Sequence, residues 1–388
     1  MEDFVFEVPS RILFGRESIK KLGAECAKFG KRALLVTENI FHDWNLPEKT
    51  VSILRDSGCD CIVHSDLETH STSIQIEKGR ELAVKGKTHI VIGLGGVRAL
   101  SIAKCIAKTA PLHESMDDLL DGISIGLDSL PYIEIPTTCR NPFMLTGEAP
   151  VIDARNRDLH VIQTELYPAA VLIDPELSVS LSPKYTAMTI LDTILCSIEG
   201  LVSKRSTFFS DSLFLRALRS LLSCIKDSME DPKNLDLREQ ASQAGLLSAL
   251  GLSMSRTGIG TALSHAISGK FYVPQSWVAS VLLPRTLSMY SESQYEKIAR
   301  VYDVLDPSSK NYGGMEKESS TMEKAGAAAE SILHISASLK LPLRLSNFGL
   351  KLEQLFSAAE GARKFPGVES MPVPVTLESV YDIIKQSF

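Results

Sequence analysis

Hydrophobic and polar positions follow different periods in the two halves of the chain. In the first half, short apolar runs alternate with amphipathic segments of about 10 to 15 residues. We expect strands at 12–15, 32–38, 59–67, 88–96, 132–138 and 169–175, and helices at 18–30, 47–57, 73–86 and 98–108. Strands that alternate with helices predict right-handed crossovers and a parallel sheet.

After Asp174-Pro175 almost every segment has helical period. We expect helices at 185–203, 210–229, 238–253, 290–304, 321–339 and in the C-terminal segment that follows Thr376, a suitable N-cap. The polar, glycine-containing segment 307–321 is typical of a surface loop. We therefore predict a Rossmann-like α/β domain over residues 1–176, a helical domain over residues 177–388, and a ligand site in the cleft between them.

Composition narrows the class of protein. The 388 residues are 44% hydrophobic and 23% charged, which is typical of a soluble globular protein. The net charge of −6 does not favour a nucleic-acid partner. No apolar run reaches about 18 residues, and the start has no signal-peptide pattern, so we expect no membrane association. Seven cysteines without a CxxC pair indicate free thiols, and we predict a cytoplasmic protein.

The stretch IVIGLGGVRALSIAK carries the best nucleotide-binding pattern. Glycines 95 and 96, between a buried strand and a helix, let backbone N–H groups approach a phosphate. The alternative is a tight turn with no ligand. Glu38 ends the strand RALLVTE, where a carboxylate can accept hydrogen bonds from a ribose and disfavour the 2′-phosphate of NADP. An isolated glutamate after a strand can equally be a solvated surface residue.

Two further features suggest chemistry in the second half. Asp192 and Cys196 are four residues apart on one expected helix, hence on one face, where they could bind a metal or simply pack. Metal sites usually have three or four protein ligands, and this helix face offers two. The neighbouring residues alone therefore favour the interpretation that both side chains simply pack. The stretch TALSHAISGKFYVPQSW holds a lone histidine, His265, which is either a buried hydrogen-bonded residue or part of a catalytic cluster.

Several stretches, in order and spacing, are similar to one family. They are VPSRILFGRESIKKLG, RALLVTE, VIGLGG, IPTT, LIDPELSVSLSPKYTAMTILD and GIGTALSHAISGKFYVPQSWVASVLLP. The chain resembles the iron-containing (group III) alcohol dehydrogenases along nearly its whole length. The resemblance implies a dehydroquinate synthase-like architecture, a homodimer, and hydride transfer between NAD(P) and a small alcohol or aldehyde. In the family a metal, usually iron and sometimes zinc, polarises the substrate oxygen.

The metal-binding positions of the family depart from its pattern in this chain. The resemblance places the family's aspartate ligand on Asp192, and its three histidine ligands on Cys196, Thr261 and Gln275. One carboxylate and one thiol are too few strong donors for firm binding, so we expect neither iron nor zinc. His265 matches a histidine that, in the family, is not a metal ligand.

The cofactor positions depart as well. The family pattern GGGSxxDxAK appears as GGVRALSIAK at 95–104, so Val97 replaces a glycine and Arg98 replaces a serine. The family's TTAGTGSE appears as TTCRNPFM at 137–144. We expect NAD to be the cofactor, bound by Glu38, Gly95, Gly96, Arg98, Thr137 and Thr138.

Three hypotheses for function remain open from the sequence. The first is an NAD-dependent oxidoreductase that works without the family's iron, with His265 as proton donor and Asp192 or Cys196 beside it. The second is a catalytically inactive homologue that keeps the scaffold for assembly or regulation. The third is an enzyme of another reaction class with Cys139 or Cys196 as nucleophile.

Overall fold

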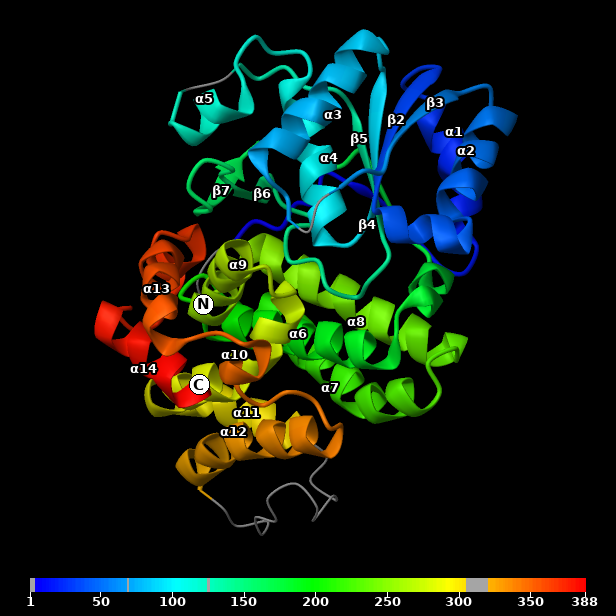
Figure 1. The fold of residues 1–388 in the computed structure, drawn as a ribbon. Helices are drawn as coiled ribbons and strands as arrows, with labels where there is room; N and C mark the ends of the chain where they lie inside the picture. The colour runs from blue at the N-terminus through cyan, green and yellow to red at the C-terminus, as the bar shows by residue number, and fades with distance from the viewer. Residues whose placement is uncertain (1–3, 68–69, 124–125, 305–319) are drawn as a thin grey trace. The chain divides into compact units, whose positions relative to one another are not determined.

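The computed structural model describes residues 4–67, 70–123, 126–304 and 320–388 (Figure 1). Contacts divide the chain into two compact units. One is Glu7–Ser180, and the other is Leu181–Phe388 joined by the N-terminal residues up to Phe6. We predicted a boundary after residue 176, and the division falls after Ser180. Most of the surface loop expected at 307–321 lies outside the described residues.

The first unit contains a six-stranded parallel sheet, and the expected fold class is confirmed. The strand order is β1-β8-β5-β4-β2-β3, with every pair parallel (Figure 1). The strands are β1 Arg11–Phe14, β2 Arg32–Thr37, β3 Asp60–His64, β4 Ile90–Gly95, β5 Tyr132–Pro136 and β8 Ala170–Ile173. The central strand β4 is apolar throughout because helices cover both faces of the sheet.

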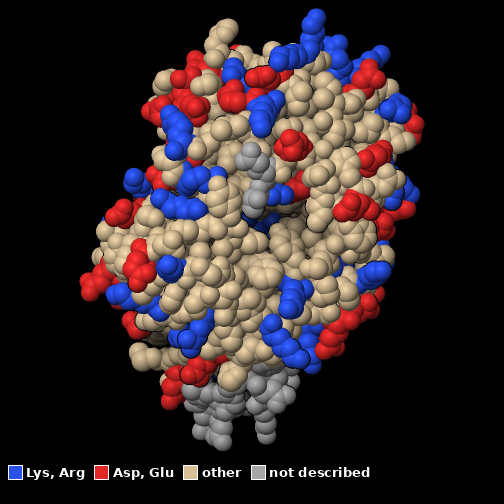
Figure 2. Space-filling view, viewed as in Figure 1, with Lys and Arg blue, Asp and Glu red and all other residues tan. Residues whose placement is uncertain are grey.

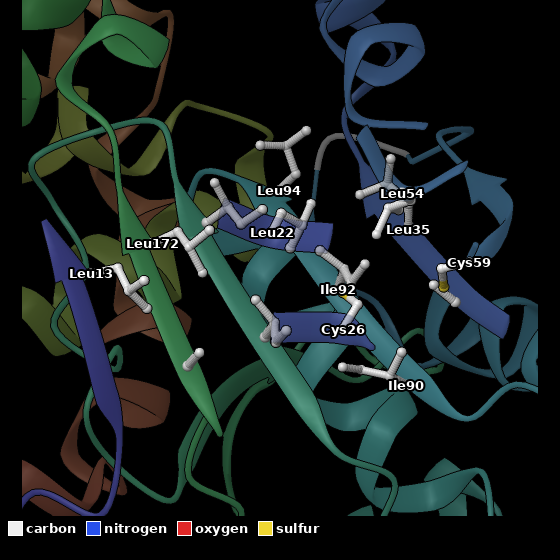
Figure 3. Packing of buried hydrophobic residues seen from close by; sticks show 14 of the residues in the cluster. Leu13, Leu22, Cys26, Leu35, Leu54, Cys59, Ile90, Ile92, Leu94 and Leu172 are labelled. Carbon is white, nitrogen blue, oxygen red and sulfur yellow. The ribbon is translucent and has the colours of Figure 1, made fainter. Parts of the chain in front are cut away.

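Side-chain alternation separates the core into two layers. Leu35 and Ile92 face one way, toward α1 and α2, as the close view shows for that layer (Figure 3). Leu34 and Val91 face the other way, toward α3 and α4. These helices are α1 Leu22–Cys26, α2 Leu46–Asp56, α3 Ser73–Lys85 and α4 Val97–Thr109. The period of two along a strand thus decides which helices each residue meets.

The sheet reverses its direction of winding between β2 and β4. From β2 the chain passes through α2 on one face to β3, and from β4 it passes through α4 on the other face to β5. β2 and β4 are hydrogen-bonded neighbours, with Thr37 opposite Leu94 at their carboxyl ends. Ligands of open parallel sheets bind outside the carboxyl ends at such a switch point.

Some elements of this unit differ from the expectation. The helix expected at 18–30 is a 3₁₀ turn at Ser18–Lys21 followed by the short α1. The elements that were not expected include two 3₁₀ helices at Asn39–Trp44 and Pro175–Ser180, α5 at Met116–Leu120, and a hairpin of β6 Glu148–Ile152 with β7 Leu159–Gln163. Pro150 interrupts the β-type pattern of β6, which a proline can enter only in an edge strand.

Helices build the second unit. They are α6 Pro183–Val202, α7 Phe208–Glu230, α8 Leu235–Met254, α9 Ile259–Phe271, α10 Gln275–Ser293, α11 Tyr295–Val304, α12 Thr321–Ser338, α13 Phe356–Arg363 and α14 Leu377–Ser387. α14 begins as expected, since Thr376 accepts a hydrogen bond from the N–H of Ser379. The helix expected at 290–304 is instead the end of α10 and all of α11, with a break at Gln294.

α6 is the central helix of this unit. Its Ser182 cap and Pro183 at the first turn fix where it begins. A side chain on Gly200 would run into the ring of Phe214, so only glycine allows α7 to approach so closely. Among the described residues, α6 alone is long and apolar enough to cross a membrane by length and composition, but 94% of that window is buried inside the structure. Its apolar character is that of a core helix.

The N-terminal residues belong to the helical unit through aromatic contacts. The ring of Phe4 lies 5.6 Å from that of Phe208, edge to face, and the ring of Phe6 lies 5.1 Å from that of Phe209. Such pairs stabilise beyond the area that they bury.

Candidate functional site

The strand β4 enters α4 through two glycines. Gly95 ends β4 with φ of +151°, a conformation that side chains rarely adopt. A Cβ on Gly95 would also collide with the Glu38 carboxylate. Gly96 is the N-cap of α4, whose first backbone N–H groups have no partner within the helix. The turn therefore offers hydrogen-bond donors and positive potential at its surface.

Glu38 follows β2 and lies against this turn. Its Oε1 accepts a hydrogen bond from the Gly96 N–H at 3.3 Å and lies 3.7 Å from Nη2 of Arg98. Burial raises the pKa of the Glu38 carboxyl, and the Arg98 charge and the Gly96 N–H oppose that shift. The structure thus brings together Glu38, Gly95, Gly96 and Arg98 at the switch point.

The two predicted threonines follow β5. The Thr137 N–H donates to the Gly95 carbonyl at 3.0 Å, and Thr138 donates its hydroxyl to the Arg140 carbonyl at 3.0 Å. Thr137 is therefore beside the glycine turn.

Unpartnered polar atoms gather at the same edge of the sheet. In the described parts of the chain, buried atoms without a hydrogen-bond partner include Thr37 Oγ1, Glu38 Oε2, Arg98 Nε and Thr137 Oγ1. Buried polar groups normally have partners, so this set fits a polar ligand. N–H donors and a guanidinium suit a phosphate, and carboxylate and hydroxyl groups suit a ribose. These residues fit a nicotinamide dinucleotide.

Two buried, electrostatically interacting charged residues near this edge, Lys104 and Glu134, were missed in the sequence. Lys104 on α4 donates to the carbonyls of Phe143 at 2.7 Å and Thr146 at 2.9 Å. Glu134 on β5 accepts from the Asn141 amide, and burial raises its pKa to about 7 although Lys104 lowers it. Each of the two residues thus bonds to the segment that follows the two threonines. A glutamate inside the apolar run YIEIP was the signal available in the sequence.

The four positions that the resemblance placed on the metal site do meet in the helical unit. Cys196 Sγ lies 3.9 Å from Asp192 Oδ1 on α6 and 3.5 Å from Thr261 Oγ1 on α9. The Gln275 side-chain amide, at the start of α10, lies 3.4 Å from Asp192 Oδ1. Three helices therefore converge on one buried carboxylate, and we call these four residues the α6 cluster.

Two serines also contact the α6 cluster. Ser276 donates its hydroxyl to Asp192 Oδ2 at 2.8 Å, and Gln275 donates to the Ser264 hydroxyl at 2.6 Å. The sequence reasoning missed both serines. Their nearness in sequence to Thr261 and Gln275 was the only indication.

Glu199 links α6 to the start of α9. Its carboxylate accepts hydrogen bonds of 2.7 Å from the N–H groups of Gly258 and Gly260. Burial raises the pKa of Glu199 to about 7, against the lowering effect of these hydrogen bonds. Glu199 is seven residues after Asp192 and shares its helix face, which was the missed signal. This contact fixes the helix that carries Thr261.

His265 lies one helical turn after Thr261 on α9. The imidazole is mostly buried, and its ring stacks with that of Phe365 at 6.5 Å and 23°. Helical spacing places His265 on the face that carries Thr261. Of the two cysteines considered as nucleophiles, Cys196 is buried in the α6 cluster, while Cys139 is half-buried after Thr138 in the α/β unit.

Known proteins match the chain over nearly its whole length. Residues 9–175 match the model of the iron-containing alcohol dehydrogenases, and residues 186–388 match the C-terminal model of the same family. The chain is 22% identical to the NAD-dependent methanol dehydrogenase of Bacillus methanolicus, covering 98% of this chain and 99% of that protein. It is 26% identical to the 1,3-propanediol dehydrogenase of Citrobacter freundii, with 99% of each covered.

Solved structures agree on the fold. An archaeal halo-thermophilic alcohol dehydrogenase from a Red Sea brine pool has a TM-score of 0.92 at 23% identity, with 100% of each chain covered. Sulfoacetaldehyde reductase from Bifidobacterium kashiwanohense, solved in complex with NAD+, has a TM-score of 0.85 at 19% identity, covering 100% of this chain and 99% of that one.

The match to an iron-containing family contradicts the expectation that neither iron nor zinc is a cofactor. That expectation equated the loss of imidazoles with the loss of the metal. Carboxylate, thiolate, neutral oxygen donors and water are also metal ligands. The described residues contain no group of three or more His, Cys, Asp and Glu side chains arranged around one point. The donor set of the α6 cluster therefore does not fit the usual three-ligand site.

Proposed function

Because the chain belongs to the iron-containing alcohol dehydrogenase family, we propose that it transfers hydride between NAD(H) and a small alcohol or aldehyde. One observation gives the main support for NAD(H) as the cofactor. Glu38, Gly95, Gly96 and Arg98 meet at the switch point of a parallel sheet, where dinucleotides bind.

Each cofactor residue has a definite role in this proposal. The Gly96 N–H, the start of α4 and Arg98 bind phosphate. Glu38 accepts hydrogen bonds from ribose hydroxyls, and its charge disfavours the extra phosphate of NADP. Thr137 and Thr138 border the turn. The nicotinamide supplies or accepts the hydride when the cofactor is bound.

We assign the transfer of the proton that accompanies hydride transfer to a side chain of the helical unit. His265 donates a proton to the substrate oxygen or accepts one from it, because an imidazole nitrogen can serve as donor or acceptor. Asp192, held by Ser276 and Gln275, provides negative charge in the α6 cluster, whose Thr261 lies one turn before His265 on α9.

The proposal includes the partners and the compartment. The protein acts on a small molecule as a cytoplasmic homodimer, with neither nucleic acid nor membrane as a partner. Positive and negative side chains are interspersed on the face shown in Figure 2, which supports the absence of a nucleic-acid site there.

Nucleotide binding and turnover test this function together. Purified full-length protein, with its iron and zinc content measured, is titrated with NADH and NADPH by fluorescence and assayed with short alcohols and aldehydes. We expect NADH to bind and aldehyde to be reduced. The assay is run on the protein with the metal content it has after purification, and again after Fe(II) or Zn(II) is added. His265→Ala and Asp192→Asn should lower kcat at least about tenfold while NADH still binds. Failure of both nucleotides to bind at millimolar concentration would overturn the proposal.

A second candidate is a catalytically inactive homologue that serves assembly or regulation. It is favoured by the α6 cluster, in which the side chains at the family's ligand positions contact one another. Nucleotide binding without turnover under any metal condition would select this candidate over the first.

A further inference from the structure

The Glu38 carboxylate lies on the donors of the glycine turn. Oε1 accepts from the Gly96 N–H and lies 3.7 Å from Nη2 of Arg98. Oε2 stands where any side chain on Gly95 would have to go. Only 7% of the Glu38 surface is exposed, and Oε2 is a buried acceptor without a partner among the described residues.

These donors are the ones that a nucleotide phosphate requires. A phosphate at this turn needs two donors, the backbone N–H at the N-terminus of α4 and the Arg98 guanidinium beside it. The helix α4 is 13 residues long. Two anions in one site of low dielectric repel each other strongly. The Glu38 carboxylate and a phosphate therefore cannot use the Gly96 N–H together.

We propose that Glu38 competes with the nucleotide phosphate for the glycine turn and must be displaced from Gly96 and Arg98 before a dinucleotide binds. The inference rests on the proposed nucleotide function. It makes Glu38 a determinant of affinity in addition to its role toward the ribose.

The length of the side chain is the critical feature. Aspartate at position 38 keeps the negative charge but is one C–C bond shorter, about 1.5 Å. The contact with Gly96 N is already 3.3 Å, so a shortened carboxylate cannot reach the turn. The variant Glu38→Asp therefore removes the contact with the glycine turn and keeps the negative charge at the end of β2.

The experiment measures two ligands on the full-length protein. Dissociation constants for NADH and for inorganic diphosphate are determined by calorimetry for the wild type and Glu38→Asp. Diphosphate has no ribose, so it reports on the turn alone. We expect Glu38→Asp to bind diphosphate about tenfold more tightly, the scale of one hydrogen bond to a charged group. NADH should gain less, because the shorter carboxylate also reaches the ribose less well. Circular dichroism checks that the variant is folded.

A matched control removes one charge elsewhere. Glu81 is an exposed residue of α3 paired with Lys85, so Glu81→Gln should leave both dissociation constants unchanged. Equal or weaker diphosphate binding by Glu38→Asp overturns the inference. If no protein binds NADH while Glu38→Asp still binds diphosphate more tightly, the proposed function fails and the competition at the turn stands.

Discussion

Glu199 on α6 accepts a hydrogen bond of 2.7 Å from the backbone N–H of Gly260 in the first turn of α9. The carboxylate satisfies N–H groups that have no partner within α9 and lies at the positive end of that helix. Because Thr261 is the next residue, this contact also sets the position of one member of the α6 cluster.

The buried Glu199 should make stability depend on pH. Its pKa is about 7 in the folded protein against an ordinary value of 4.5. The folded state therefore binds a proton more tightly than the unfolded state, and stability is lost as pH rises between these values. From about pH 5 to 8, the unfolding free energy of the wild type should fall relative to Glu199→Gln by up to roughly 3 kcal/mol. Urea unfolding at several pH values measures this, and parallel curves would contradict it.

The two glycines of the turn should differ sharply in their tolerance of alanine. Gly95→Ala places a Cβ onto the Glu38 carboxylate at positive φ, so it should cost about 2 kcal/mol or more. Gly96 has negative φ, and its nearest contact for a Cβ is 3.6 Å away. Gly96→Ala should therefore cost about 1 kcal/mol or less. Thermal and urea unfolding compare the two, and equal losses would count against this account of the turn.

Ser276 should matter more than a neighbouring buried serine. Ser276→Ala removes a hydrogen bond to the buried Asp192 carboxylate and should cost about 1.5–3 kcal/mol. Ser280 on the same helix donates to the uncharged Trp277 carbonyl, so Ser280→Ala should cost about 1 kcal/mol or less. The comparison uses urea unfolding at pH 7. A Ser276→Ala loss no larger than that of the control would show that Asp192 does not depend on this hydroxyl.

Substitutions of Lys104 and Glu134 should have strongly coupled effects on the free energy of unfolding. Lys104→Met leaves the buried Glu134 without a counter-charge and should cost about 3–5 kcal/mol. Adding Glu134→Gln removes that uncompensated charge, so the double variant should be more stable than the sum of single effects predicts. A double-mutant cycle by chemical unfolding measures the coupling energy. Additive effects would show that the two groups do not interact.

Local patterns in the sequence were sufficient for most of the elements. The run IVIGLGG predicted β4 because a strand covered on both faces is apolar throughout. Thr376 predicted the start of α14 because an N-cap acts only on the next few residues. The hairpin β6–β7 was missed because its short strands contain a proline and several polar residues, and their pairing comes from tertiary contacts.

The sequence by itself determined what depends on neighbours along the chain. Asp192 and Cys196 share a helix face because they are four residues apart, and Gly95 and Gly96 form a turn between a strand and a helix. Only the tertiary structure decided that Ser276 meets Asp192 across 84 positions and that Glu38 reaches Gly96 across 58. Periodicity fixes the type and face of an element, whereas distant contacts depend on the order in which strands and helices pack. That packing placed the Glu38 carboxylate on the glycine turn, for which the sequence alone indicated a phosphate site.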